Sequence, residues 1–128
     1  MSTDKKKKKE KKKILIVDDE STIRWVLKSA LESDDLAVFE AQYGQEGLAM
    51  VKELEPDLVI MDYRMPDING WDVAKEVLKI LPGTTIIGHT GYANKENIDK
   101  GLQSGCIEIL DKPVDLDTWE KTINKYLF

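Results

Sequence analysis

The sequence predicts an α/β fold, a doubly wound parallel sheet of five strands with five helices. Short apolar runs alternate with longer segments in which apolar residues recur every three or four positions, as in amphipathic helices. The apolar runs lack period-two alternation, which is typical of strands covered on both faces. The expected strands are 14–17, 36–39, 57–61, 84–88 and 107–110.

The first two helices follow the first two strands. The first begins at Glu20 or Ser21 and ends before an acidic turn at 34–35, and the second follows Gly44 and stops by Pro56. Each presents one apolar stripe to the sheet. The stripes are Ile23, Val26, Leu27, Ala30 and Leu31 in the first helix, and Leu48, Val51 and Leu54 in the second.

The other three helices are bounded in the same way. The third opens at Gly70 and stops at the Pro-Gly pair 82–83, a short fourth spans 94–103, and Asp115 is the expected N-cap of the fifth. The apolar face of the third helix is formed by Trp71, Ala74, Val77, Leu78 and Leu81, and that of the fifth by Leu116, Trp119, Ile123, Tyr126 and Leu127. The fourth helix carries Ile98 and Leu102.

Length and composition bound the class of protein. A chain of 128 residues with 41% hydrophobic content predicts one domain with a single modest core. It has no apolar run long enough for a membrane span and no apolar signal segment after Met1. The lone Cys106 excludes an internal disulfide. Together these features predict a cytoplasmic protein.

Charge divides the chain into a tail and a body. In residues 1–13, eight lysines against Asp4 and Glu10 give a net charge of +6, so the overall −5 leaves −11 for the rest. The Lys-rich tail 1–13 is predicted to be disordered, because like charges repel and no apolar face is present. Residues 14–128 form the expected domain, whose acidity argues against nucleic-acid binding.

Charged and polar groups follow the strands at their carboxyl ends. Asp18 and Asp19 follow the first strand, Asp62 closes the third, Thr90 follows the fourth and Lys112 follows the fifth. In an open parallel sheet these ends meet at one edge, where ligands bind. An ionised carboxylate buried without a partner costs several kcal/mol, so the acids must be exposed, paired or bound to metal.

Three converging carboxylates suit a divalent cation, and hard oxygen ligands with room for water suit Mg²⁺. Blander alternatives remain open: Asp18 and Asp19 as helix caps, Thr90 as a local turn hydrogen bond, and Lys112 as a solvated surface lysine. Pro113 makes the bond before it a candidate cis peptide.

Other reactive residue types are predicted to be structural. His89 is expected to be packed or exposed, not a phosphodonor or metal ligand, and Cys106 to be a buried, inert thiol. The three tryptophans, Trp25, Trp71 and Trp119, are expected on helix faces or the surface, with no catalytic role.

These motifs together resemble the receiver domain of two-component response regulators. They are the acidic pair, the Asp-x-x-Met-Pro-x-x-x-Gly segment 62–70, Thr90 and the Lys-Pro pair 112–113, and the resemblance covers 13–128. It implies the flavodoxin-like strand order 2-1-3-4-5. The length implies a single-domain receiver, similar to the stand-alone receivers of chemotaxis and of the sporulation phosphorelay. A monomer is expected.

The resemblance also implies the chemistry. Asp62 would accept a phosphoryl group from a phosphohistidine on a histidine kinase or phosphotransfer protein. Thr90 and Lys112 would bind phosphoryl oxygens, and the downstream target would dock on the last two helices and the fifth strand. Mg²⁺ would be held by Asp19 and Asp62, by Asp18 largely through water, and by the backbone carbonyl of Arg64.

One position departs from the family and two alternatives stay open. Ile109 stands where receivers usually carry an aromatic residue coupled to the Thr, which leaves the switch mechanism undetermined. The chain could instead be a Mg²⁺-dependent phosphohydrolase with an Asp nucleophile, although Arg64 stands where such an enzyme places an acid. It could also be a receiver-like interaction module without phosphorylation.

Overall fold

The computed structural model describes residues 10–128 and contains a five-stranded parallel sheet in the order β2-β1-β3-β4-β5, as expected. The sheet is paired without a break from Leu36↔Lys12 at one edge to Thr90↔Asp111 at the other. The strands are β1 (Lys12–Val17), β2 (Leu36–Ala41), β3 (Leu58–Asp62), β4 (Thr85–Thr90) and β5 (Glu108–Asp111).

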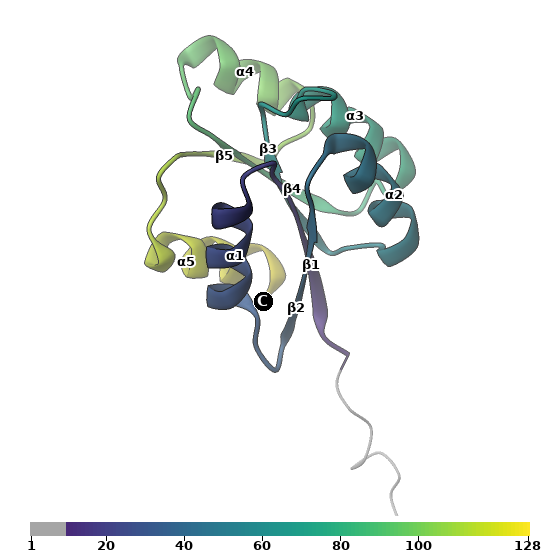
Figure 1. Ribbon diagram of the computed structural model, residues 1–128, viewed down its shortest axis with the longest axis vertical. Coiled ribbons are helices and arrows are strands. Elements are labelled where there is room, and N and C mark those ends of the chain that lie inside the picture. The colour runs from purple at the N-terminus through teal and green to yellow at the C-terminus, as the bar shows by residue number, and fades with distance from the viewer. Residues whose placement is uncertain (1–9) are drawn as a thin grey trace, which may run out of the picture.

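Five helices cover the two faces of this sheet (Figure 1). They are α1 (Ser21–Leu31), α2 (Gly44–Leu54), α3 (Gly70–Ile80), α4 (Lys95–Gln103) and α5 (Leu116–Leu127). The core has two parts: α1 and α5 pack on one face of the sheet, and α2, α3 and α4 pack on the other. Within residues 10–128, no helix is long and apolar enough to cross a bilayer.

The first strand begins earlier than predicted. Lys12 pairs with Leu36 and Lys13 with Ala37, and the Lys13 backbone N–H also donates to the carboxylate of Asp57 at 2.8 Å. The prediction of disorder was therefore wrong for residues 12 and 13, because pairing with β2 organises them despite their charge. Residues 1–9 of the predicted tail lie outside the described residues.

The buried residues of α4 are not the two apolar residues, Ile98 and Leu102, that the sequence marks in this helix. Its buried residues are Asn97 and Gly101, whereas Leu102 is 45% exposed. The side chains of Ile109 in β5 and Trp71 in α3 occupy the space in front of Gly101, so α4 needs a small residue there. Val26 of α1 and Leu116 of α5 belong to predicted apolar faces but are also exposed, at 39% and 44%.

Candidate functional site

Lys112 joins the acidic groups at the carboxyl edge of the sheet. Its ammonium Nζ lies 3.1 Å from Oδ2 of Asp18, 3.3 Å from Oδ1 of Asp62 and 3.4 Å from Oε1 of Glu20. Asp18 and Asp62 are buried, and the Lys112 side chain is only 15% exposed. The surface-lysine alternative is thus excluded, and the predicted convergence of β1, β3 and β5 side chains is observed.

The electrostatics of this group show an excess of negative charge. Burial, with the neighbouring Asp18 carboxylate adding to it, raises the pKa of Asp62 to about 7. Burial likewise raises the pKa of Asp18, although the Glu20 backbone N–H and Lys112 oppose this. Burial alone would lower the pKa of Lys112, but Asp18 and Asp62 outweigh it and raise the pKa.

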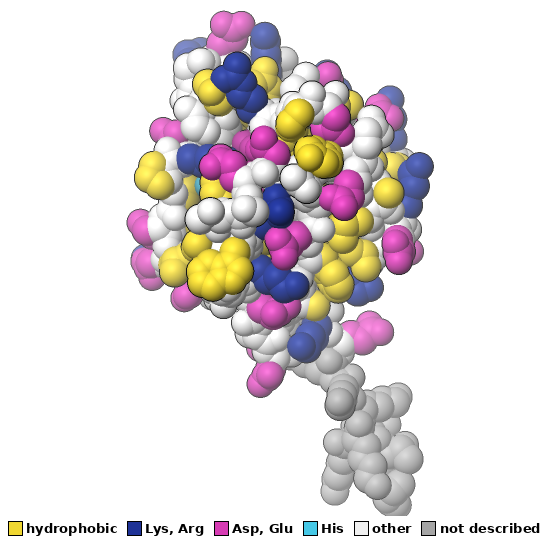
Figure 2. Space-filling model, in the orientation of Figure 1, with side chains coloured by type: hydrophobic (Ala, Val, Ile, Leu, Met, Phe, Trp, Pro, Cys, Tyr) yellow, Lys and Arg dark blue, Asp and Glu magenta, His cyan; other side chains and the backbone are white. Residues whose placement is uncertain are grey.

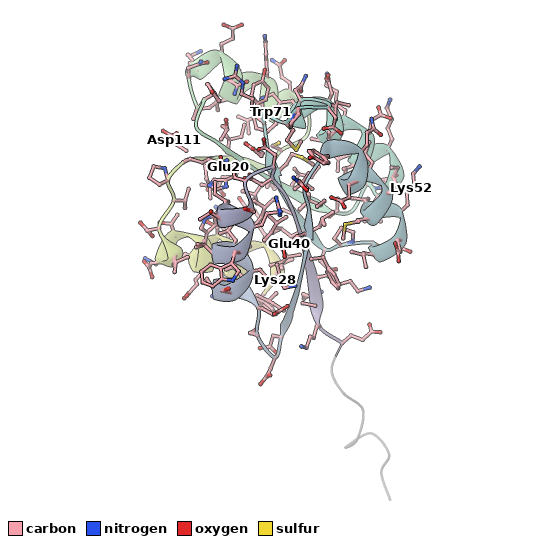
Figure 3. The ribbon with its side chains drawn as sticks, in the orientation of Figure 1. Glu20, Lys28, Glu40, Lys52, Trp71 and Asp111 are labelled. Atoms are coloured by element: carbon pink, nitrogen blue, oxygen red, sulfur yellow. The ribbon has the colours of Figure 1, made fainter. Side chains whose placement is uncertain are left out.

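A third acid belongs to the site beside the predicted pair. Asp18, Asp19 and Glu20 can each place a carboxylate oxygen within 4.8 Å of the others. Figure 3 shows Glu20 at the start of α1, at the same end of the molecule as Trp71 and Asp111. Glu20 was not predicted, although its place next to Asp19 was a signal. Carboxylate oxygens in excess over one ammonium fit a hard divalent cation such as Mg²⁺.

Thr90 is fully buried at the end of β4. Its Oγ1 accepts a hydrogen bond from the Tyr92 backbone N–H at 2.9 Å, and its carbonyl accepts one from the Lys112 backbone N–H at 2.8 Å. The Lys112–Pro113 bond is cis, as the sequence suggested. The local turn bond predicted as the alternative role of Thr90 is therefore present. Thr90 also lies on β4, between β3, which ends at Asp62, and β5, which Lys112 follows.

The turn after Asp62 depends on Gly70. The Gly70 N–H donates to the Tyr63 carbonyl at 2.7 Å, and a Cβ on Gly70 would overlap the carbonyl oxygen of Asp62. Asn69 then caps α3 by accepting from the Asp72 N–H at 3.0 Å. This explains the glycine of the 62–70 motif: the chain folds back onto the strand end that carries Asp62.

Arg64 and Tyr92 bridge the two loops beside the site. The Arg64 guanidinium lies 4.7 Å from the centre of the Tyr92 ring and donates to its hydroxyl. The Arg64 side chain thus reaches from the β3–α3 loop to the β4–α4 loop. Arg64 and Tyr92 line a groove of about 480 Å³, whose other walls come from the β3–α3 loop and α4. In Figure 2, acidic and basic side chains are intermingled on the face in view rather than segregated.

The remaining reactive residues are placed as predicted. His89 is buried and packs edge-on against Trp119, with ring centres 5.0 Å apart. Neither of its ring nitrogens has a hydrogen-bond partner among residues 10–128. Cys106 is buried, and burial raises its thiol pKa to about 12. Trp25 is exposed on α1.

Replacing His89 by phenylalanine is expected to make the protein less sensitive to acid. Burial, helped by the charge of Lys112, lowers the pKa of His89 from 6.5 to about 3. The unfolded chain therefore binds a proton that the folded chain does not, and stability is lost as pH falls from 6.5 towards 3, by about 2 kcal/mol at pH 5.

Urea unfolding of both proteins at pH 7 and pH 5 measures this effect. The raised pKa of Asp62 has the opposite sign, because it favours the folded state as the proton binds, but it is common to both proteins and cancels in the comparison. His89 is the only histidine in the chain, so phenylalanine removes all imidazole titration. A stability difference between the two proteins that is the same at both pH values would contradict the prediction.

Comparisons with known proteins agree with this geometry. Residues 14–124 match the model of the response regulator receiver domain. Over 108 residues the chain is 34% identical to the chemotaxis protein CheY of Thermotoga maritima, covering 84% of this chain and 90% of that protein. It is 35% identical to the protein PilH of Pseudomonas aeruginosa, covering 85% and 92%.

Solved structures and longer regulators extend the comparison. A receiver domain structure from Clostridium thermocellum superposes with a TM-score of 0.83 at 36% identity, covering 91% of this chain and 94% of that one. The match to the regulator NtrC of Salmonella typhimurium, 33% identical, covers 77% of this chain but only 21% of that protein. The chain belongs to the response regulator receiver domain family of two-component systems.

Proposed function

We propose that this receiver accepts a phosphoryl group on Asp62 in two-component or phosphorelay signalling. The observation that carries the proposal is the triangle at the sheet edge, in which Lys112 lies within 3.3 Å of both the Asp62 and Asp18 carboxylates. An aspartate held beside a fixed cation is a competent nucleophile, and phosphoryl transfer depends mainly on positioning and charge stabilisation.

The proposed step is an exchange of one bond to phosphorus. An oxygen of the Asp62 carboxylate attacks the phosphorus of a phosphohistidine on a histidine kinase or phosphotransfer protein. The O–P bond forms as the P–N bond breaks, and the imidazole leaves with the bonding electron pair and takes a proton from water. Lys112 offsets charge on the phosphoryl oxygens, and the Thr90 hydroxyl donates to one of them.

The acidic group has the composition of a cation site. Asp19 and Asp62 would hold Mg²⁺ with the Arg64 backbone carbonyl, and Asp18 would act through water. When bound, the ion would neutralise charge on the transferring group. Asp18 already accepts from the Glu20 N–H at 2.8 Å and pairs with Lys112, which supports its indirect role.

The alternatives are less well supported. A phosphohydrolase needs an acid near the nucleophile to protonate the leaving group and activate water, yet Arg64 occupies that place and is engaged with Tyr92. A module that has lost phosphorylation would have no need of buried carboxylates at 18 and 62, whose charge Lys112 must offset. Receiver domains interact with histidine kinases and downstream targets. We propose the face formed by α4, β5 and α5 as the docking surface for the target.

Incubation with acetyl phosphate and Mg²⁺, followed by intact mass measurement, tests the proposal. The wild type is expected to gain one acid-labile phosphoryl group per chain, with no multiple turnover of phosphate esters. Asp62→Asn should remain unlabelled because its amide is not a nucleophile. Asp117→Asn, an exposed acid on α5, is the matched control and should label normally. Undiminished labelling of Asp62→Asn would refute the assignment.

Mg²⁺ affinity is expected to depend unequally on the two adjacent acids. Asp19→Asn removes a proposed direct ligand and should weaken binding by about tenfold or more, whereas Asp18→Asn should weaken it less. Titration of the unphosphorylated proteins with Mg²⁺, followed by tryptophan fluorescence, gives both affinities; Trp25 on α1 is exposed near the start of that helix. Equal affinity in the wild type and Asp19→Asn would rule out the ligand set.

A further inference from the structure

A series of three hydrogen bonds leads from the site to α3. The Trp71 indole Nε1–H donates to Oδ1 of Asn97 at 2.9 Å, and Nδ2 of Asn97 donates to the Tyr92 carbonyl at 2.8 Å. The Tyr92 N–H in turn donates to Oγ1 of Thr90 at 2.9 Å. Trp71 and Asn97 are both buried. The hydroxyl at the site is therefore connected through α4 to the first turn of α3.

The donor and acceptor groups allow only one orientation of the Asn97 side-chain amide. An indole N–H can only donate, so the Asn97 carbonyl oxygen must face Trp71 and its NH₂ must face the Tyr92 carbonyl. Both halves of the Asn97 amide are thus used, one on each neighbour. A side chain at position 97 that lacks either a donor or an acceptor would leave Trp71 or the Tyr92 carbonyl without this partner.

Close packing fixes the indole where α3, α4 and the sheet meet (Figure 3). A Cβ on Gly101 of α4 would lie 3.0 Å from Cε2 of Trp71, and one on Gly88 of β4 would lie 2.8 Å from its Cη2. The side chain of Ile109 borders both glycines. Ile109 has no polar group to offer the β4–α4 loop, so the hydrogen-bonded connection runs through Asn97 and Trp71 instead.

We propose that Asn97 is a positioning residue that ties the β4–α4 loop to Trp71, so that a change at Thr90 is transmitted to α4 and α3. This rests on the proposed function of Asp62. When the Thr90 hydroxyl moves to a phosphoryl oxygen, the Tyr92 N–H loses its acceptor in the present geometry. The backbone on both sides of the Tyr92 Cα then shifts, and the buried Asn97 side chain follows because its NH₂ would otherwise lose the Tyr92 carbonyl.

The test follows the three indole N–H resonances by ¹H–¹⁵N NMR, with and without beryllofluoride and Mg²⁺ as a phosphoryl mimic. Trp→Phe variants assign them. In the wild type the Trp71 resonance is expected to shift. In Asn97→Asp the acceptor for Trp71 remains but the donor to Tyr92 is lost, so the shift should fall by more than half. Gln103→Glu, which adds the same charge at an exposed position of α4, should behave as wild type.

Two outcomes would overturn the proposal. One is an unmoved Trp71 resonance in protein that acetyl phosphate labels at Asp62, which leaves the proposed function intact. The other is a shift of equal size in Asn97→Asp and wild type. If Asp62 does not label at all, the proposed function fails separately, and the positioning role is judged in the unliganded protein. In the unliganded protein, Asn97→Asp should speed amide hydrogen exchange at Tyr92 by about tenfold relative to Gln103→Glu. Equal exchange rates in the two variants would refute the positioning role of Asn97.

Discussion

Replacing Lys112 by methionine is expected to lower the free energy of unfolding by about 2–4 kcal/mol at pH 7. Methionine keeps most of the aliphatic stem but removes the ammonium that lies between Asp18, Asp62 and Glu20. Breaking a buried ion pair from one side leaves uncompensated charge, which costs about 3–5 kcal/mol. Protonation of Asp62, whose pKa is already raised to about 7, relieves part of that cost.

Urea unfolding with and without millimolar Mg²⁺ measures the effect. Mg²⁺ should restore part of the lost stability in Lys112→Met, because a cation would again neutralise the acids. The double variant Lys112→Met/Asp62→Asn should be more stable than Lys112→Met, since one of the uncompensated carboxylates is gone. A single variant as stable as wild type would mean that Lys112 does not hold the acidic group together.

Replacing Gly70 by alanine is expected to destabilise the protein by about 3 kcal/mol and to slow labelling of Asp62. The added methyl group would meet backbone atoms of Asp62 and Tyr63, which cannot turn aside as a side chain can. The strand end or the start of α3 must therefore move, and overpacking of this kind costs about 1–3 kcal/mol, occasionally more. Because the displaced atoms belong to Asp62, chemistry and stability should fall together.

Gly83→Ala is the matched control, since no atom lies within 4 Å of a Cβ built there. Its free energy of unfolding should stay within about 1 kcal/mol of the wild type, and its labelling rate should not change. The comparison uses urea unfolding together with the time course of acetyl phosphate labelling. Normal labelling of Gly70→Ala would show that the turn can relax without moving Asp62.

The five strands, the two covered faces of the sheet and the residues gathered at its carboxyl edge could all be predicted from the sequence. Apolar runs and helical periodicity report burial, and they place Asp18, Asp62, Thr90 and Lys112 at strand ends. Parallel strands then bring those ends to one edge, whichever helices lie between them. The motif that ends at Gly70 could also be recognised in the sequence, but the close approach of Gly70 to the Asp62 backbone could not.

Features that depend on packing partners could not be predicted from the sequence. The sequence marks Leu102 as an apolar residue of α4, but the side chains of Ile109 and Trp71 fill the space in front of Gly101, and Asn97 is the buried side chain that bonds to Trp71. Lys12 and Lys13 belong to β1 because β2 pairs with them, a contact that local charge does not reveal. Residues distant in the sequence decide which side chains of a helix are buried and where a strand begins. Hydrophobic periodicity indicates that a residue is buried, but it does not identify the residues that pack against it.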